Sequence, residues 1–154
     1  IALQTYYKEP NSKNGILNYN VINAKARELM KEFDVRGAGE LIAGGELSGG
    51  NQQKAVIARE IDRDPELLIV SQPTRGLDVG AIEYIRKRII AERDKGKAVI
   101  VVSFELDEIL DMSDRIAVIY DGAIQGILDP AETNKQDLGI LMAGGQLNKE
   151  EANV

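Results

Sequence analysis

The chain has 154 residues, of which 44% are hydrophobic and 29% are charged, so it can bury a sizeable core and is not a disordered chain. Its net charge of −6 argues against a protein that works by neutralising nucleic-acid phosphates. It contains no cysteine and no histidine, which excludes disulfides, thiolate metal sites and imidazole chemistry and fits a reducing cytoplasm.

The first 45 residues contain one helical pattern, which follows a polar loop. Between Val21 and Phe33 the apolar residues recur at helical spacing, and they share one face: Ile22, Ala26, Leu29 and Met30. A glycine-rich stretch, 35–46, follows this helix. We therefore predict a helix over about 21–33 between two loops.

From residue 51 onward, amphipathic helices alternate with short apolar strands. A helix at 52–61 is expected to turn Val56, Ile57 and Ile61 inward, and the strand "LLIV" follows it. The next helix, 81–93, carries a stripe of isoleucines (Ile82, Ile85, Ile89), ends at Gly96, and is followed by the strand "AVIVV".

The last part of the chain begins with a short acidic helix, "ELDEILDM", in which Asp107 and Glu108 are expected on a solvated face. The strand "RIAVIY" and the segment "AIQGIL" should form a hairpin, because Asp121-Gly122 between them is a typical hairpin turn. Apolar strands that alternate with helices indicate a parallel sheet covered by helices, the α/β class.

The octapeptide "LSGGNQQK", Leu47–Lys54, is the most specific stretch of the sequence. Ser48 is a good helix N-cap, and Gly49 and Gly50 leave the backbone bare where a helix begins, so that amide N–H groups can meet an anion such as phosphate. The plain structural interpretation is a capped helix after a flexible loop, which "SGG" alone would favour.

The full motif, together with "PTRGLDVGA", resembles the signature region of ABC-type ATPases, in the branch that imports monosaccharides and nucleosides. The resemblance is strong over 47–145. It implies that two nucleotide-binding domains close head to tail, so that the signature of one contacts the ATP held by the other. The residues implied to face that nucleotide in trans are Ser48, Gly49, Gly50, Asn51, Gln53 and Asp78. Asp78 is equally well placed to be the N-cap of the following helix.

Three positions depart from the pattern of this family. The strand "LLIV" resembles a Walker B strand, which ends in Asp-Glu, but here Ser71 and Gln72 follow it, and Phe104 stands where the family has a histidine. Ser71 offers no carboxylate to Mg²⁺, Gln72 cannot accept a proton from water, and a phenyl ring cannot donate a hydrogen bond to phosphate. The resemblance therefore implies a degenerate site with no intact catalytic residue and no metal ligand. An engineered Gln72 that traps ATP is the alternative, and Ser71 argues against it.

The 154 residues contain no G-x-x-x-x-G-K-[ST] phosphate loop, and the chain begins at Ile1 without a methionine. We therefore expect an excised piece: a partial P-loop NTPase (ABC ATPase) domain with a parallel sheet flanked by helices, plus part of the helical signature subdomain. The expected parts are the helical subdomain at 1–60, the C-terminal part of the ATPase core at 61–145 and a polar tail at 146–154.

The resemblance implies the second nucleotide-binding domain of a bacterial importer for nucleosides or simple sugars, with ATP and Mg²⁺ as cofactors of the full-length protein. The implied partners are a first nucleotide-binding domain or a dimer mate and transmembrane permease subunits, with no nucleic acid. No apolar run approaches the ~20 residues of a membrane span. The resemblance implies a peripheral position on the cytoplasmic face of the membrane. This chain alone is expected to be inactive and to self-associate. Two alternatives stay open: a purely structural half of a transporter, and a soluble ABC ATPase acting on ribosomes or DNA.

Overall fold

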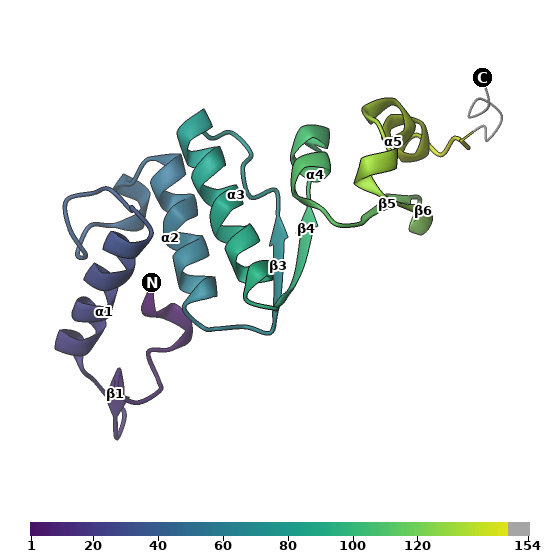
Figure 1. The fold of residues 1–154 in the computed structure, drawn as a ribbon. Coiled ribbons are helices and arrows are strands. Elements are labelled where there is room, and N and C mark those ends of the chain that lie inside the picture. Colours follow the sequence, from purple (N-terminus) through teal and green to yellow (C-terminus); the bar gives the residue numbers. More distant parts are fainter. Residues whose placement is uncertain (148–154) are drawn as a thin grey trace. The chain divides into compact units, whose positions relative to one another are not determined.

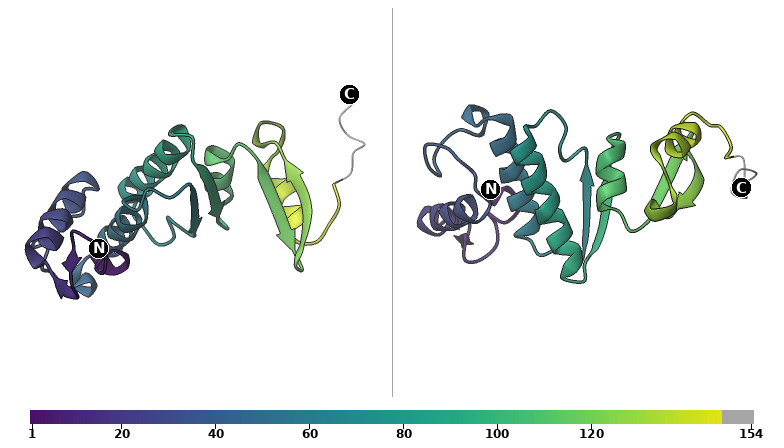
Figure 2. Two further views of the ribbon diagram at one scale, coloured as in Figure 1. Left: turned by 90° about the horizontal axis from the view of Figure 1, so that it is seen from below. Right: turned by 45° about the horizontal axis from the view of Figure 1, so that its top comes forward.

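The computed structural model of the chain describes residues 1–147 (Figures 1 and 2). These residues group into two compact units, Ile1–Ile100 and the residues from Val101 onward. Of the predicted polar tail, 146–154, Gln146 and Leu147 are described, and the remainder lies outside the described residues.

The first unit begins with a short 3₁₀ turn, Ala2–Gln4, and a small hairpin that the sequence did not predict. Strands β1 (Ser12–Lys13) and β2 (Ile16–Leu17) pair antiparallel in the segment that was expected to be a polar loop. The predicted helix follows as α1, Tyr19–Glu32. It starts two residues earlier than its apolar pattern, because the Asn18 side chain accepts a hydrogen bond from Val21 N at 3.3 Å and caps the helix.

The alternation of helices and strands is confirmed. After a 3₁₀ turn at Gly44–Glu46, the chain forms α2 (Gly49–Ile61), β3 (Leu67–Ser71), α3 (Val79–Asp94) and β4 (Ala98–Val102) (Figure 1). Strands β3 and β4 are neighbours in one parallel sheet, and α3 provides the crossover that parallel neighbours need. The α/β class is therefore correct.

Helix α2 packs between α1 and α3, and the three helices enclose most of the core of this unit (Figure 2). The buried apolar residues of the first unit are Leu29, Phe33, Val35, Ile57, Ala58, Ile61, Leu68, Ala81, Ile85 and Ile89. The prediction for Val56 is wrong, because 41% of this side chain is exposed. Ile57 and Ile61 are buried, as predicted, and Ala58 is buried in addition, because α2 has neighbours on two sides.

The second unit contains α4 (Leu106–Met112), the strands β5 (Ile116–Tyr120) and β6 (Ala123–Leu128), a 3₁₀ turn at Pro130–Glu132 and α5 (Lys135–Met142). The predicted hairpin is confirmed: β5 and β6 pair antiparallel, and Asp121 and Gly122 both have positive φ between the paired Tyr120 and Ala123. Its core is formed by Ile116, Val118, Leu138 and Leu141, with Leu106, Ile109, Leu110, Leu128 and Leu147 packed against them.

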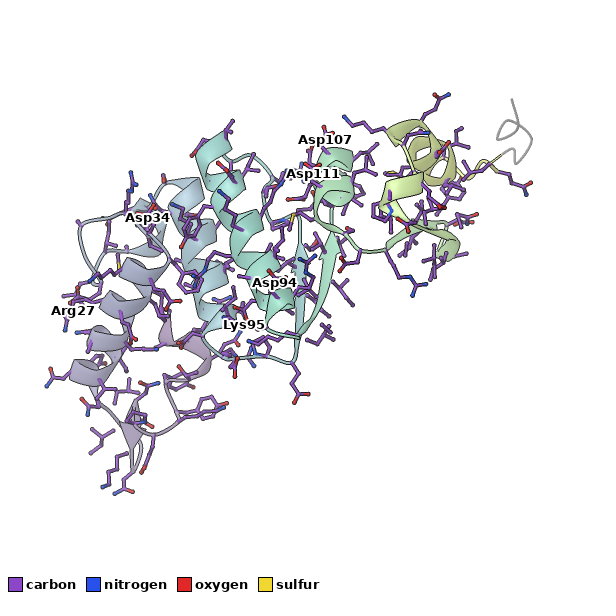
Figure 3. The ribbon with its side chains drawn as sticks, in the orientation of Figure 1. Arg27, Asp34, Asp94, Lys95, Asp107 and Asp111 are labelled. Carbon is purple, nitrogen blue, oxygen red and sulfur yellow. The ribbon has the colours of Figure 1, made fainter. Side chains whose placement is uncertain are left out.

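Helix α4 does not present all its acidic residues to solvent. Asp107 and Asp111 point away from the helix (Figure 3), and the side chain of Asp107 is 70% exposed in an ion pair with Lys135. Glu108 is fully buried, so the prediction of a solvated position for this residue is wrong. Asp107 and Glu108 are adjacent in sequence and therefore lie on different faces of the helix, and the pattern of charges did not show which of them is buried.

No helix in the stretch 1–147 combines the length and the apolarity that crossing a membrane requires.

Candidate functional site

The start of α2 is built around Ser48, which stands directly before the first helical residue, Gly49. The backbone carbonyl of Ser48 accepts the first helical hydrogen bond, from Gln52 N at 2.8 Å. Its side chain does not cap the helix, contrary to the usual behaviour of a serine at this position. The amide N–H groups of the first turn are therefore not capped by the Ser48 hydroxyl.

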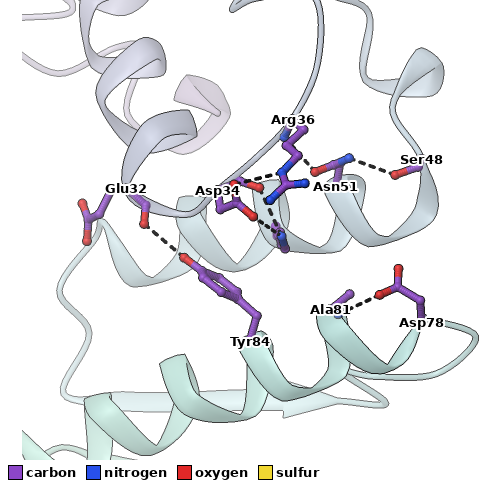
Figure 4. Close-up of polar contacts among 9 residues, drawn as sticks. Glu32, Asp34, Arg36, Ser48, Asn51, Asp78, Ala81 and Tyr84 are labelled. Carbon is purple, nitrogen blue, oxygen red and sulfur yellow. Dashed lines mark hydrogen bonds and ion pairs between the residues drawn. The ribbon is translucent and has the colours of Figure 1, made fainter.

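The hydroxyl of Ser48 is instead part of a short hydrogen-bond chain (Figure 4). The Asn51 side chain donates from Nδ2 to Ser48 Oγ at 2.9 Å, and its Oδ1 accepts from the backbone N–H of Arg36 at 2.8 Å. The side chain of Gln52 donates to the carbonyl of Leu47 at 2.8 Å. The loop before α2 and the loop after α1 are thus tied to the first turn of α2.

The two glycines of the motif have different surroundings. A side chain at Gly49 would meet no atom within 4 Å, so the backbone there is open to a ligand. A Cβ at Gly50 would lie 3.3 Å from the Cβ of Ala81 and 3.7 Å from Asp78 Oδ2. Gly50 therefore allows α2 to approach the start of α3 closely, a packing role that the motif alone did not reveal.

Asp78 is the N-cap of α3, which was one of its two predicted roles beside contact with a nucleotide in trans. Its Oδ1 accepts a hydrogen bond from Ala81 N at 2.9 Å (Figure 4). Because Asp78 also lies beside Gly50, the N-termini of α2 and α3 are neighbours. Gln53 is half-buried on the second turn of α2.

Next to the first turns of α2 lies a cluster of three charged side chains and one tyrosine: Asp34, Arg36, Lys54 and Tyr84. Lys54 donates to the Asp34 carboxylate at 2.9 Å and to the Asp34 carbonyl at 3.2 Å, and its ammonium lies 4.7 Å from the centre of the Tyr84 ring. Arg36 Nε donates to the same carboxylate at 3.1 Å. The hydrogen bonds from Lys54 and then from Arg36 lower the pKa of Asp34.

Helix α3 holds the end of α1 from the other side. Tyr84 donates its hydroxyl proton to the Glu32 carbonyl at 3.0 Å, and Arg88 donates to the Glu32 carboxylate at 2.6 Å. The Arg88 guanidinium also stacks 3.9 Å from the centre of the buried Phe33 ring. Residues 32–36 are thus fixed by both α2 and α3, which limits how far the Arg36 N–H can move relative to Asn51.

The end of β3 offers neutral side chains. Ser71 is exposed, and Gln72 is half-buried with a left-handed backbone, φ 50°, directly before the buried Pro73. The third departing residue, Phe104, lies in the second unit with 72% of its surface exposed. Phe104 is therefore not packed as a core aromatic residue.

The start of α2 and the end of β3 differ in the chemistry that they can support. The start of α2 has an open glycine, uncapped amide groups and a hydroxyl, which together suit a phosphate oxygen. The end of β3 has no carboxylate from Ser71 or Gln72, so it does not suit Mg²⁺ or a general base. Among residues 1–147 there is no cluster of three acidic side chains that could hold a metal ion.

Sequence reasoning did not find Asp34 or Tyr84 as parts of the site. A signal for Asp34 was present: a negative charge just after the C-terminus of α1 is unfavourable there and indicates a cationic partner. Nothing in the local sequence identified Lys54 as that partner, because the two residues are 20 positions apart.

Two curated relatives match nearly the whole chain. It is 74% identical over 149 residues to the nucleoside import ATP-binding protein NupA of Lactococcus lactis subsp. cremoris (strain MG1363), covering 97% of this chain and 29% of the relative. It is 58% identical over 144 residues to the guanosine import ATP-binding protein NupO of Bacillus subtilis (strain 168), covering 94% and 28%. The chain thus spans less than a third of the length of these relatives. No protein-family profile matches it.

Solved structures share the fold. A dimeric ATP-binding cassette in a post-hydrolysis state, bound to ADP and Pi, superimposes with a TM-score of 0.64 at 25% identity, over 77% of this chain and 51% of the other. The ATP-binding subunit of an ABC transporter gives a TM-score of 0.66 over 82% of this chain and 56% of the other, and at 18% identity this likeness concerns the fold alone.

Proposed function

Because the chain belongs to the ATP-binding proteins of ABC importers, in the branch that serves sugars and nucleosides, we propose that it donates its signature motif to an ATP site held by another domain. The ligand of the α2 start would be the γ-phosphate of that ATP. The site that this domain itself would host is degenerate. The transported solute would be a nucleoside or a simple sugar, the classes named for its relatives.

One observation carries the proposal: the Ser48 hydroxyl does not cap α2, so the amide groups of the first turn and the open backbone at Gly49 can receive an anion. Asp78 stands beside this turn as the N-cap of α3. Hydrolysis at the ATP site of this domain itself would need two carboxylates and a hydrogen-bond donor to phosphate. Ser71 and Gln72 do not supply the carboxylates, and Phe104 does not supply the donor.

The proposal includes partners. The ATP and Mg²⁺ would be held mainly by a first nucleotide-binding domain of the same polypeptide or by a dimer mate, and the dimeric cassette with the same fold supports this arrangement. Permease subunits would anchor the assembly at the cytoplasmic face of the membrane, with this chain peripheral. In this arrangement the chain corresponds to the later part of the second nucleotide-binding domain, with its helical subdomain at 1–60 and its ATPase core at 61–145.

The 154 residues alone should neither hydrolyse ATP nor bind it tightly, because they contain no phosphate loop. The combined variant Ser71→Asp, Gln72→Glu and Phe104→His should stay inactive in this chain. Micromolar affinity for ATP in calorimetry, or turnover by the combined variant, would contradict the proposed position of the phosphate site.

The decisive experiment is an uptake assay on the full-length importer at matched expression. Ser48→Arg blocks the start of α2 and Gly49→Asp puts a negative charge beside the γ-phosphate, so each should abolish ATP-driven uptake. Ser71→Ala and Gln72→Ala should leave most of it. If the two pairs lose activity equally or in reverse order, the proposal is wrong. A purely structural half would tolerate all four changes.

A further inference from the structure

We infer that Asn51 is a positioning residue that acts through the Ser48 hydroxyl, and not a ligand of the phosphate itself. This inference rests on the proposed function, since it concerns how Ser48 is prepared for the nucleotide. It departs from the expectation that Asn51 faces the nucleotide as Ser48 does.

The orientation of the Asn51 amide is fixed by its surroundings. The backbone N–H of Arg36 can only donate, so the atom 2.8 Å from it must be the carbonyl oxygen of the amide. The amide nitrogen therefore faces Ser48, and because it can only donate, Ser48 Oγ accepts at 2.9 Å. If the Asn51 amide were flipped, its NH2 group would face the N–H of Arg36, and two donors cannot form a hydrogen bond.

This arrangement decides what the Ser48 hydroxyl can still do. A hydroxyl that accepts from Asn51 keeps its own proton, and it can donate this proton to a phosphate oxygen. The same bond holds Oγ away from the backbone N–H of Asn51, which a serine at this position would normally cap. Asn51 thus leaves both the hydroxyl proton and the amide groups of the first turn for the ligand.

The anchor of this arrangement is the loop 34–36. Lys54 holds Asp34 by its carboxylate and by its carbonyl, and its side chain is only 11% exposed. Arg36 reaches the same carboxylate at 3.1 Å, and its N–H meets Asn51. The position of the Asn51 oxygen is therefore set by contacts that join residues 15 and 20 positions apart in sequence. For a direct bond to phosphate Asn51 would have only the second hydrogen of its amide nitrogen, because Arg36 holds the oxygen and Ser48 takes the first hydrogen.

A double-mutant cycle on the full-length ATPase in its importer complex tests the inference. We expect Ser48→Ala and Asn51→Ala each to lower ATP turnover, by about tenfold or more for the loss of a hydrogen bond to a charged group. In the Ser48→Ala background, Asn51→Ala should have almost no further effect, since its route to the nucleotide has been removed. Multiplicative losses would overturn the inference, because they would mean that Asn51 contacts the nucleotide independently.

An isosteric variant separates positioning from folding. Asn51→Asp keeps an acceptor for the Arg36 N–H, so the melting temperature should stay within a few degrees of the wild type. Its second oxygen can only accept, so the Ser48 hydroxyl would turn its proton toward position 51 and away from the phosphate. Turnover should therefore fall at least as far as in Asn51→Ala. Wild-type turnover in Asn51→Asp would also overturn the inference.

Two controls complete the design. Val56→Glu adds the same charge to α2 at a side chain that is 41% exposed and lies outside the hydrogen-bond chain of the site, and Asn20→Ala removes an exposed amide on α1, so both should keep most of the activity. If Val56→Glu loses as much as Asn51→Asp, charge and not the hydrogen bond is responsible, and the inference is wrong. If Ser48→Ala has no effect, the proposed function fails with it, whereas a normal Ser48 effect with independent Asn51 losses removes only the inference.

Discussion

The start of α2 and the end of β3 are two ends of elements in the same unit, and they differ in what supplies their chemistry. At the start of α2 the groups that can bind phosphate are backbone amides and the Ser48 hydroxyl. Asn51 donates a hydrogen bond to this hydroxyl, and the backbone at Gly49 is open to a ligand. At the end of β3 the expected groups are side-chain carboxylates, and Ser71 and Gln72 do not provide them. The first end depends on geometry, and the second depends on residue identity.

This difference has a general consequence. A backbone N–H survives almost every substitution, so the α2 start can be lost only through a change in its surroundings or by an added obstacle. A carboxylate disappears with a single substitution. Variants that disturb packing should therefore damage the α2 side, whereas further variants at the β3 side should do little.

The largest expected effect uses the two phenylalanines of the chain as a matched pair. Phe33 is 1% exposed and lies under Arg88 at the end of α1, whereas Phe104 is 72% exposed. Phe33→Ala should lower the free energy of unfolding by about 3–5 kcal/mol, because it leaves a cavity behind the loop 34–36. Phe104→Ala should change it by at most about 0.5 kcal/mol.

Urea unfolding of both variants, followed by circular dichroism, measures this difference. Hydrogen exchange at the Arg36 amide adds a local test, since Phe33→Ala should speed exchange there by loosening its bond to Asn51. Equal destabilisation by both variants would show that the end of α1 does not support the α2 start as argued.

A smaller effect is expected from the backbone at the end of β3. Gln72 has φ 50°, a conformation that costs a non-glycine residue about 1–2 kcal/mol. Gln72→Gly should therefore raise the free energy of unfolding by up to about 1 kcal/mol, after the entropy cost of glycine is subtracted. Gln72→Val should lower it, because a branched side chain fits this conformation poorly.

Thermal unfolding of Gln72→Gly, Gln72→Val and the wild type tests the order of the three stabilities. An unchanged or lower stability of Gln72→Gly would mean that contacts of the Gln72 side chain offset the strain of its backbone.

The smallest effect concerns pH and the α2 side. Hydrogen bonds from Lys54 and Arg36 keep the pKa of Asp34 in the folded chain below its unfolded value of about 3.9. Its contribution to stability is therefore complete above that unfolded value and is lost as the pH falls through the lower, folded pKa. Asp34→Asn should remove this part of the acid sensitivity.

The measurement is the slope of unfolding free energy against pH between about pH 5 and pH 2, compared for wild type and Asp34→Asn. Equal slopes would show that the Asp34–Lys54 pair does not contribute to the stability of the cluster next to the first turns of α2.

Several features of this chain could be predicted from the sequence because they depend on neighbouring residues. Helical apolar spacing located α1, α2 and α3, and Asp121-Gly122 located the hairpin. The start of α2 directly after Ser48 and the neutral side chains at Ser71 and Gln72 were also readable. Each of these depends on residues within a few positions of one another, where spacing and turn chemistry decide the outcome.

Only the tertiary structure decided how these residues are used. The bond from Arg36 N to Asn51, the pairing of Lys54 with Asp34 and the contact of Tyr84 with Glu32 join positions 15, 20 and 52 residues apart. The burial of Glu108, the exposure of Val56 and the contact of Gly50 with α3 likewise follow from how helices pack. Periodicity fixes which residues share a helix face, but the partner that covers this face is set by the packing of elements distant in sequence.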